Sequence, residues 1–232
     1  MKITIPTSWE GVTLREYQAY HMLLKEAAEK LETSTNPKVS EFETECAIIA
    51  LFSGEDMDEI LSLHQGAHNR LYNQLAFLQQ PIVGKMQTKY TLNGTKYYFE
   101  KNADKINGGQ WITLQHFLKQ DIEANLHNLM ACFAYRVHKY RFWKHTYEPK
   151  RHEAVAIDML DLPMTVVKPL TDFFLLRWES YVSRTLHYLE IQAKELQRRA
   201  RKLQPSSPNT DGSTQSTTSQ TDVPNYGTIT ST

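Results

Sequence analysis

Residues 87–118 read QTKYTLNGTKYYFEKNADKINGGQWITLQHFL, and this stretch decides the fold. Asn93-Gly94 separates two runs of strand-forming residues, 89–92 and 96–99. An Asn-Gly pair favours a type I′ turn, because both residues tolerate positive φ and the twist of the turn matches that of the strands. The sequence therefore predicts a β-hairpin over about 87–100. Gly108-Gly109 then leads into an amphipathic helix over 110–120.

The hairpin needs a packing partner, because an isolated two-stranded ribbon is only marginally stable in water. Two strand partners are open at this point. Residues 3–5 alternate in the extended pattern that a third strand would show. Alternatively, the edge of the hairpin pairs with a strand of another subunit.

The chain before the hairpin shows helical patterning. Residues 13–16 and 40–43 both fit the capping-box pattern, in which Ser or Thr is followed three residues later by Glu. Each pattern predicts a helix start, and Gly54 is placed to end the second of these helices. Short amphipathic helices are expected over 55–63 and 65–80.

After the hairpin, helices are expected over about 122–137, 151–161 and 165–203. The last is long, and Pro169 is placed in its first turn, where proline is tolerated. From residue 204 onward the composition shifts to Ser, Thr, Gln, Pro and Gly. Such a segment cannot bury enough apolar surface to offset its ordering entropy.

These patterns predict one fold class. We expect a mainly α protein with a compact multi-helix domain over 1–203, one inserted β-hairpin, a long C-terminal helix and a disordered Ser/Thr-rich tail over 204–232. The 232 residues suffice for one domain with a sizeable core.

Charge distribution, cysteine content and the lack of targeting patterns indicate the environment in which the chain works. The 26 basic and 26 acidic residues balance, but acidic residues outnumber basic ones twelve to six in residues 1–80, and basic residues outnumber acidic ones twenty to fourteen in the remainder. This asymmetry is typical of charge-complementary contacts within an assembly, of a basic surface that faces nucleic acid, or of uneven solvation. Cys46 and Cys132 lie in apolar helical runs, so free buried thiols are expected. The chain shows neither a signal-peptide pattern nor an apolar run long enough to span a bilayer. These features favour the cytoplasm.

No catalytic residue, cofactor site or metal site is predicted. The pairs His64/His68 and Glu123/His127 have i, i+4 spacing but lie in no known metal motif, so a structural role is favoured. Gly108-Gly109 lacks the flanking residues of a phosphate-binding loop, and a turn before the helix explains it.

Two basic stretches leave nucleic-acid binding open. Residues 136–152 interleave basic and aromatic side chains, and residues 184–202 carry an excess of positive charge. Basic groups for phosphates and rings for base stacking suit single-stranded nucleic acid. The competing interpretation is a connector whose rings pack on the core, and we favour it. The candidate phosphate contacts are Arg136, Lys139, Arg141, Lys144, Arg198, Arg199 and Arg201.

Several short motifs together resemble a group of small morphogenesis proteins of tailed bacteriophages, especially phages of Bacteroidetes-type hosts. The motifs cover most of residues 3–178 and form four groups. They are Ile5-Pro6-Thr7-Ser8-Trp9 with Thr13-Leu14-Arg15-Glu16-Tyr17; Gly54 with Met57 and Ile60-Leu61; Tyr97 and Phe99 with Ile106-Asn107-Gly108-Gly109-Gln110-Trp111-Ile112-Thr113-Leu114; and Asn125-Leu126-His127-Asn128-Leu129-Met130-Ala131 with Leu162-Pro163-Met164 and Phe173-Phe174. The basic helix and the tail have no counterpart in the pattern.

The resemblance implies a non-enzymatic protein that assists assembly of a virion tail or neck, such as a tail assembly chaperone. Its partner would be another phage structural protein, a tape measure protein or a tail component, in the host cytoplasm. A packaged structural protein and a homo-oligomer are also compatible with the pattern. Aromatic density suggests a contact surface at Trp143, Tyr147, Phe173, Phe174 and Trp178.

Overall fold

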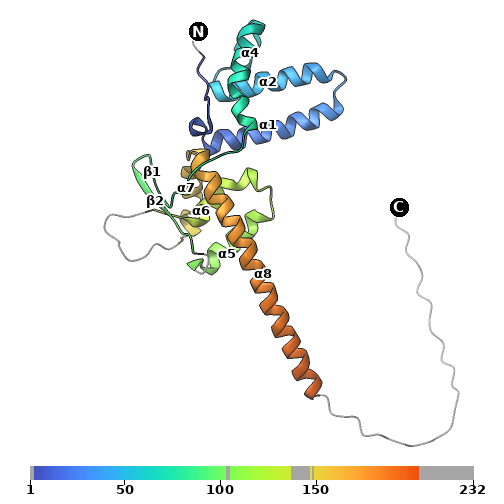
Figure 1. The fold of residues 1–232 in the computed structure, drawn as a ribbon, viewed down its shortest axis with the longest axis vertical. Helices are drawn as coiled ribbons and strands as arrows, with labels where there is room; N and C mark the ends of the chain where they lie inside the picture. The colour runs from blue at the N-terminus through green and yellow to red at the C-terminus, as the bar shows by residue number, and fades with distance from the viewer. Residues whose placement is uncertain (1–2, 103–104, 137–146, 148, 204–232) are drawn as a thin grey trace, which may run out of the picture. The chain divides into compact units, whose positions relative to one another are not determined.

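The computed structural model describes residues 3–102, 105–136, 147 and 149–203. The chain divides into two units, Met1–Thr185 and Leu186–Thr232. The predicted tail over 204–232 lies outside the described residues. The elements run in the order η1 (Trp9–Gly11), α1 (Leu14–Thr33), α2 (Pro37–Ser53), α3 (Met57–Leu61), α4 (Gln65–Gln74), η2 (Leu75–Gln79), β1 (Lys89–Leu92), β2 (Thr95–Phe99), α5 (Gly108–Leu118), η4 (Glu123–Asn125), α6 (Leu126–Phe133), β3 (Ala134–Arg136), η5 (Pro149–Arg151), α7 (His152–Met159) and α8 (Met164–Leu203) (Figure 1). The mainly α fold class with one hairpin is confirmed.

The first capping box is confirmed and the second is wrong. The side chain of Thr13 accepts a hydrogen bond from the Glu16 amide, and the Glu16 carboxylate accepts one from the Thr13 amide in return. The second helix, however, begins three residues before Ser40, at Pro37. Proline is favoured at a first helical position because its φ is already helical and its missing N–H is not needed there. Ser40 therefore lies inside α2, where its hydroxyl lies 2.8 Å from that of Ser34.

The end of α2 follows the prediction. Gly54 adopts the left-handed conformation with φ of 71°, and its amide donates to the carbonyl of Ala50. Glycine takes this conformation without a steric penalty. Beyond it, the predicted helix over 65–80 is split into α4 and the 3-10 helix η2.

The hairpin is present as predicted, and its third strand does not come from residues 3–5, which are one of the two partners that the sequence leaves open. Asn93 and Gly94 have φ of 46° and 76°, as a type I′ turn requires. The third strand is β3, which pairs antiparallel with β2 through Tyr97↔Arg136, Tyr98↔Tyr135 and Phe99↔Ala134. Residues 3–5 form no strand.

Strand β3 replaces the end of the helix predicted over 122–137, because α6 ends at Phe133 and β3 begins at Ala134. Nearly all of the run Leu129–Tyr135 is apolar, so its periodicity does not distinguish a buried helix from a buried strand. Strand pairing decides that this segment is a strand, because the edge of β2 that faces away from β1 would otherwise have backbone N–H and C=O groups without a partner.

Backbone hydrogen bonds tie the start of the chain to the turn before α8. The Leu14 amide donates to the Leu162 carbonyl over 2.8 Å, and the Met164 amide donates to the Val12 carbonyl over 2.9 Å. Val12, Leu14, Leu162 and Met164 are all fully buried. Residues about 150 apart in the chain thus form one part of the core, which is a contact that no local pattern indicates.

Helix α8 runs from Met164 to Leu203, close to the predicted 165–203. Pro169 lies in its second turn rather than its first. Because proline has no N–H, the carbonyl of Thr165 receives no hydrogen bond from the residue four positions later. Gly84 passes close to this carbonyl. None of the described helices is both long and apolar enough to cross a membrane.

Candidate functional site

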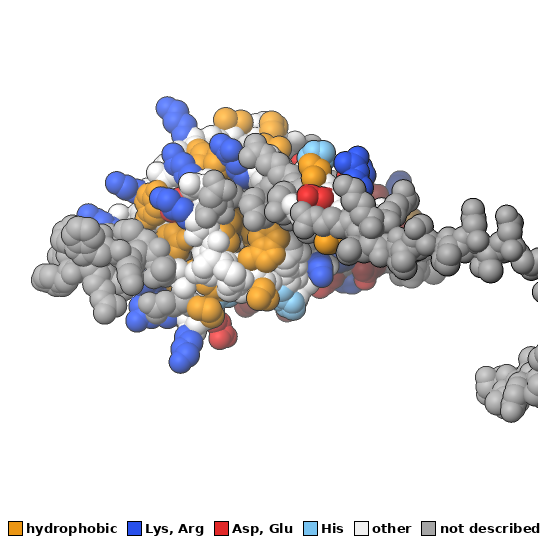
Figure 2. All heavy atoms as spheres, turned by 90° about the horizontal axis from the view of Figure 1, so that it is seen from below, with side chains coloured by type: hydrophobic (Ala, Val, Ile, Leu, Met, Phe, Trp, Pro, Cys, Tyr) orange, Lys and Arg blue, Asp and Glu red, His pale blue; other side chains and the backbone are white. Residues whose placement is uncertain are grey.

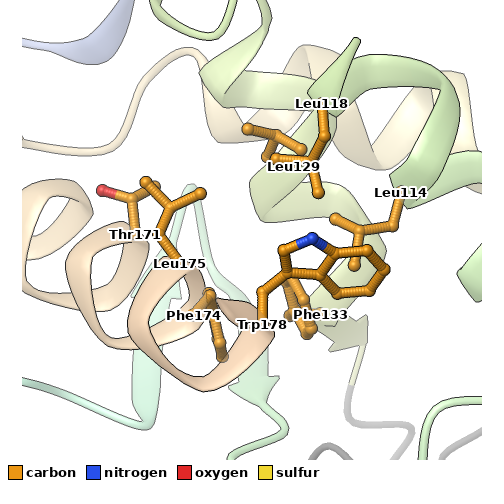
Figure 3. Close-up of a pocket in the computed structure, with 8 residues that line it drawn as sticks. All are labelled: Leu114, Leu118, Leu129, Phe133, Thr171, Phe174, Leu175 and Trp178. Carbon is orange, nitrogen blue, oxygen red and sulfur yellow. The ribbon is translucent and has the colours of Figure 1, made fainter. Parts of the chain in front are cut away.

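An apolar groove lies between three helices of the first unit. Helix α5 contributes Leu114 and Leu118, α6 contributes Leu129 and Phe133, and α8 contributes Thr171, Phe174, Leu175 and Trp178 (Figure 3). The space is about 270 Å³, including the part that is open to solvent. Two polar groups are present among these side chains, the Thr171 hydroxyl and the indole N–H of Trp178. The Thr171 hydroxyl donates to the Val167 carbonyl within α8. The groove is therefore lined almost wholly by carbon.

Aromatic stacking fixes the walls of this groove. The rings of Phe133 and Phe174 stack with centroids 3.8 Å apart and planes at 13°. The indoles of Trp111 and Trp178 lie 4.2 Å apart at 38°. Ring pairs of this kind add stabilisation beyond the area that they bury. Ring contacts thus join α8 to α5 and to α6, and three of these four rings, Phe133, Phe174 and Trp178, also line the groove.

A second hollow of about 260 Å³ adjoins the first and shares Phe133, Phe174 and Trp178 with it. Its other lining residues are Glu100, Lys101, Ile106 and Arg177. The guanidinium of Arg177 lies 5.4 Å from the ring centroid of Phe173. Charged groups of both signs thus border the apolar surface on this side.

Exposed apolar residues lie on the same helices. Ile112 on α5 is 71% exposed and Leu176 on α8 is 68% exposed. Figure 2 shows hydrophobic side chains at the surface beside Lys and Arg side chains. Exposed apolar side chains next to charged ones are typical of protein-binding surfaces.

Of the predicted contact residues, the structure brings together Phe173, Phe174 and Trp178. Phe174 is buried and Trp178 is half-buried, and both line the groove. Tyr147 is placed elsewhere. It is buried, with its hydroxyl 3.2 Å from the Thr113 hydroxyl and 3.0 Å from the His152 ring, so it supports the fold. Trp143 lies outside the described residues.

The sequence prediction missed the aliphatic half of the groove, from Leu114, Leu118, Leu129 and Leu175. These residues lie in or beside the helices that the sequence predicts over 110–120, 122–137 and 165–203, but helical spacing does not say which helices meet or where they leave a gap. The sequence therefore indicates that these leucines are buried in a core, but not that they border a groove.

Among the candidate phosphate contacts, Arg136 is committed to a partner within the fold. Its guanidinium pairs with the Asp158 carboxylate, and its Nε donates to the Tyr97 hydroxyl over 3.0 Å. Tyr97 also donates to Asp158. Burial, followed by the Asp158 hydrogen bond, raises the pKa of Tyr97 to about 12. This cluster joins β2, β3 and α7.

The other candidate phosphate contacts lie in two places along the chain. Lys139, Arg141 and Lys144 lie outside the described residues. Arg198 is exposed on α8, and the side chains of Arg199 and Arg201 on the same helix are not described.

The histidines and acids of the described chain do not gather into a metal centre. No group of three or more His, Cys, Asp or Glu side chains in that part of the chain is arranged to hold an ion. His64 instead caps α4, accepting from the Ala67 amide through Nδ1 over 3.0 Å, and His68 is buried. The i, i+4 pair is thus used for structure.

Both cysteines are free and fully buried. Burial raises the pKa of the Cys132 thiol to about 12, and burial with the nearby Glu45 and Glu43 raises that of Cys46. We expect neither thiol to react with Ellman's reagent in the folded chain at about pH 8, because the reactive species is the thiolate. Both should react in concentrated guanidinium chloride. Rapid labelling of a native thiol would show that this burial is incomplete.

Comparison with known proteins gives no match. No protein-family model matches the chain, and no curated protein or solved structure is significantly similar to it.

Proposed function

We propose that this chain is a non-enzymatic protein-binding factor that assists assembly of a tailed-phage virion, as a tail assembly chaperone does. It would hold an apolar helical segment of a tape measure protein or tail component until that segment is built into the particle. The observation that carries the proposal is the apolar groove between α5, α6 and α8.

The groove supports a protein ligand by its chemistry. Its lining offers carbon surface and large rings, which stabilise a bound apolar side chain by removing it from water. Few polar groups converge there, whereas a small-molecule site usually adds several that fix the orientation of its ligand. An amphipathic helix inserts apolar side chains into such a groove at i, i+3 and i+4 spacing. Lys101, Glu100 and Arg177 at the adjoining hollow would meet the polar flank of that helix.

The choice of partner rests on the motifs that resemble phage morphogenesis proteins. A long tail protein exposes apolar helices before assembly, and these helices aggregate unless they are covered. The proposed role therefore needs a binding surface for apolar helices and no chemistry on the ligand.

Co-expression with the tape measure protein of the same phage genome tests the proposal. We expect the wild-type chain to keep that protein soluble and to co-purify with it. Leu175→Glu should reduce the co-purified amount by about tenfold or more, because an unpaired carboxylate is costly in an apolar groove. Helicity, measured by circular dichroism, shows whether the variant is folded.

Leu61→Glu is the matched control. Leu61 lies on α3, away from the groove lining, and is 45% exposed. It should leave capture unchanged. Equal capture by both folded variants would remove the groove from the proposal. A tape measure protein that precipitates equally with and without the wild-type chain would remove the chaperone role.

A further inference from the structure

The C-terminal part of α8 has a heptad pattern. Within the second unit, the described residues are all helical, from Leu186 to the end of α8 at Leu203. Apolar residues recur there at alternating intervals of three and four, which is the a/d spacing of a coiled coil. The seam consists of Leu186, Leu189, Ala193, Leu196, Ala200 and Leu203. Val182 occupies the d position before it.

This helix has no partner among the described residues of its own unit, because they form no other element. Leu196 at a d position is 63% exposed. Most of the stability of helices in proteins comes from the packing of an apolar face rather than from helix propensity. Among the described residues of this unit, no other element is present to cover the seam.

We propose that this seam pairs with the same seam of a second copy of the chain, as an antiparallel two-stranded coiled coil. The proposal concerns α8 alone and is independent of the groove. Two features of the sequence favour a second copy in this orientation.

The first feature is the match of side-chain size across the seam. In the antiparallel arrangement with full overlap, each a position faces a d position. Leu186 then faces Leu203, Leu189 faces Ala200, and Ala193 faces Leu196 of the other copy. Each alanine meets a leucine, so the layers keep an even volume. A parallel pair would place Ala opposite Ala at two layers and leave gaps there.

The second feature is charge. Residues 195–203 hold four Lys or Arg and one Glu, whereas residues 186–194 hold one Lys and one Glu. A parallel pair would bring both basic ends together, where like charges repel. The antiparallel pair places each basic end beside the nearly neutral end of the other copy. It also sets the two helix dipoles in opposite directions.

Leu196→Asp and Ile191→Asp form a matched pair of variants. Both residues are exposed apolar side chains on this helix, at 63% and 48%, and only Leu196 lies on the seam. Ile191 is at the f position, on the opposite side of the helix. In a monomer the two changes are equivalent. In the coiled coil only the first buries a carboxylate.

Analytical ultracentrifugation of the full chain is the measurement. We expect a dimer whose dissociation constant rises by about 100-fold or more in Leu196→Asp and stays within about threefold in Ile191→Asp. A monomer at all concentrations, or a dimer unchanged in Leu196→Asp, would overturn the proposal.

Disulfide trapping tests the orientation. Leu186→Cys and Leu203→Cys chains, mixed and oxidised, should form a disulfide between the two different variants. In the antiparallel pair the two copies of residue 203 lie roughly 25 Å apart along the axis, so Leu203→Cys alone should not cross-link. The native cysteines are buried and do not compete. A dimer that cross-links only through like positions would overturn the antiparallel orientation.

Discussion

Gly84→Ala is expected to destabilise the chain by about 3 kcal/mol, which lowers the melting temperature by roughly 6–12 °C for a domain of this size. A Cβ built at Gly84 lies 1.9 Å from the Thr165 carbonyl oxygen and 3.1 Å from Cγ of Pro169. The first contact is with backbone in α8, which cannot rotate away as a flexible side chain would. Either the segment at residue 84 or the start of α8 must move.

The cause is the proline in the second turn of α8. Pro169 donates no hydrogen bond to the Thr165 carbonyl, so this carbonyl can face a passing chain instead of the next helical turn. Only a residue without a side chain approaches so closely. Thermal unfolding followed by circular dichroism measures the effect.

Gly108→Ala is the control for that measurement. No atom lies within 4 Å of a Cβ built at Gly108, the first residue of α5. The change should alter stability by less than about 0.5 kcal/mol. Equal stability of Gly84→Ala and Gly108→Ala would show that Gly84 does not lie against α8 as described.

Gln110→Glu is expected to cost about 3 kcal/mol or more at neutral pH. Gln110 is 1% exposed. Its Oε1 accepts from the Asn107 amide at the start of α5. Its Nε2 donates to the Cys132 carbonyl over 2.7 Å and to the Tyr135 hydroxyl over 2.9 Å. A carboxylate could replace the acceptor, but it would set a negative charge against the carbonyl.

The loss of stability in Gln110→Glu should increase with pH. Burial disfavours the charged form, so the pKa of a glutamate at position 110 is higher in the folded chain than in the unfolded chain, where it is about 4.3. The part of the loss that comes from ionisation is therefore absent below the unfolded pKa, grows as pH rises from the unfolded to the folded pKa, and is complete above the folded pKa. Urea unfolding of the variant at about pH 4 and pH 7, each compared with wild type, measures it.

Gln65→Glu is the control for this series. Gln65 is exposed at the first position of α4, where an acid is favourable to the helix dipole. It should leave stability within about 0.5 kcal/mol at both pH values. A pH-independent loss in Gln110→Glu would mean that the side chain has left its buried site.

The sequence predicted those elements whose signals act within a few residues. The Thr13–Glu16 box, the Asn93-Gly94 turn and the Gly54 stop each depend on one or two φ angles or one short hydrogen bond. The capping box predicted at Ser40 is wrong, because the helix already begins three residues earlier, at Pro37. The capping box that Asn107 and Gln110 form in the structure was missed.

Tertiary structure decided which of these elements meet. The sequence marked Leu114, Leu129 and Phe174 as apolar, and only the crossing of α5, α6 and α8 makes them neighbours around a groove. Likewise, β3 exists because β2 offers it an edge, although its own residues fit a helix equally well. Local chemistry sets the φ angles and caps of a segment, whereas the partner of an apolar face is chosen by packing against segments far away in the chain.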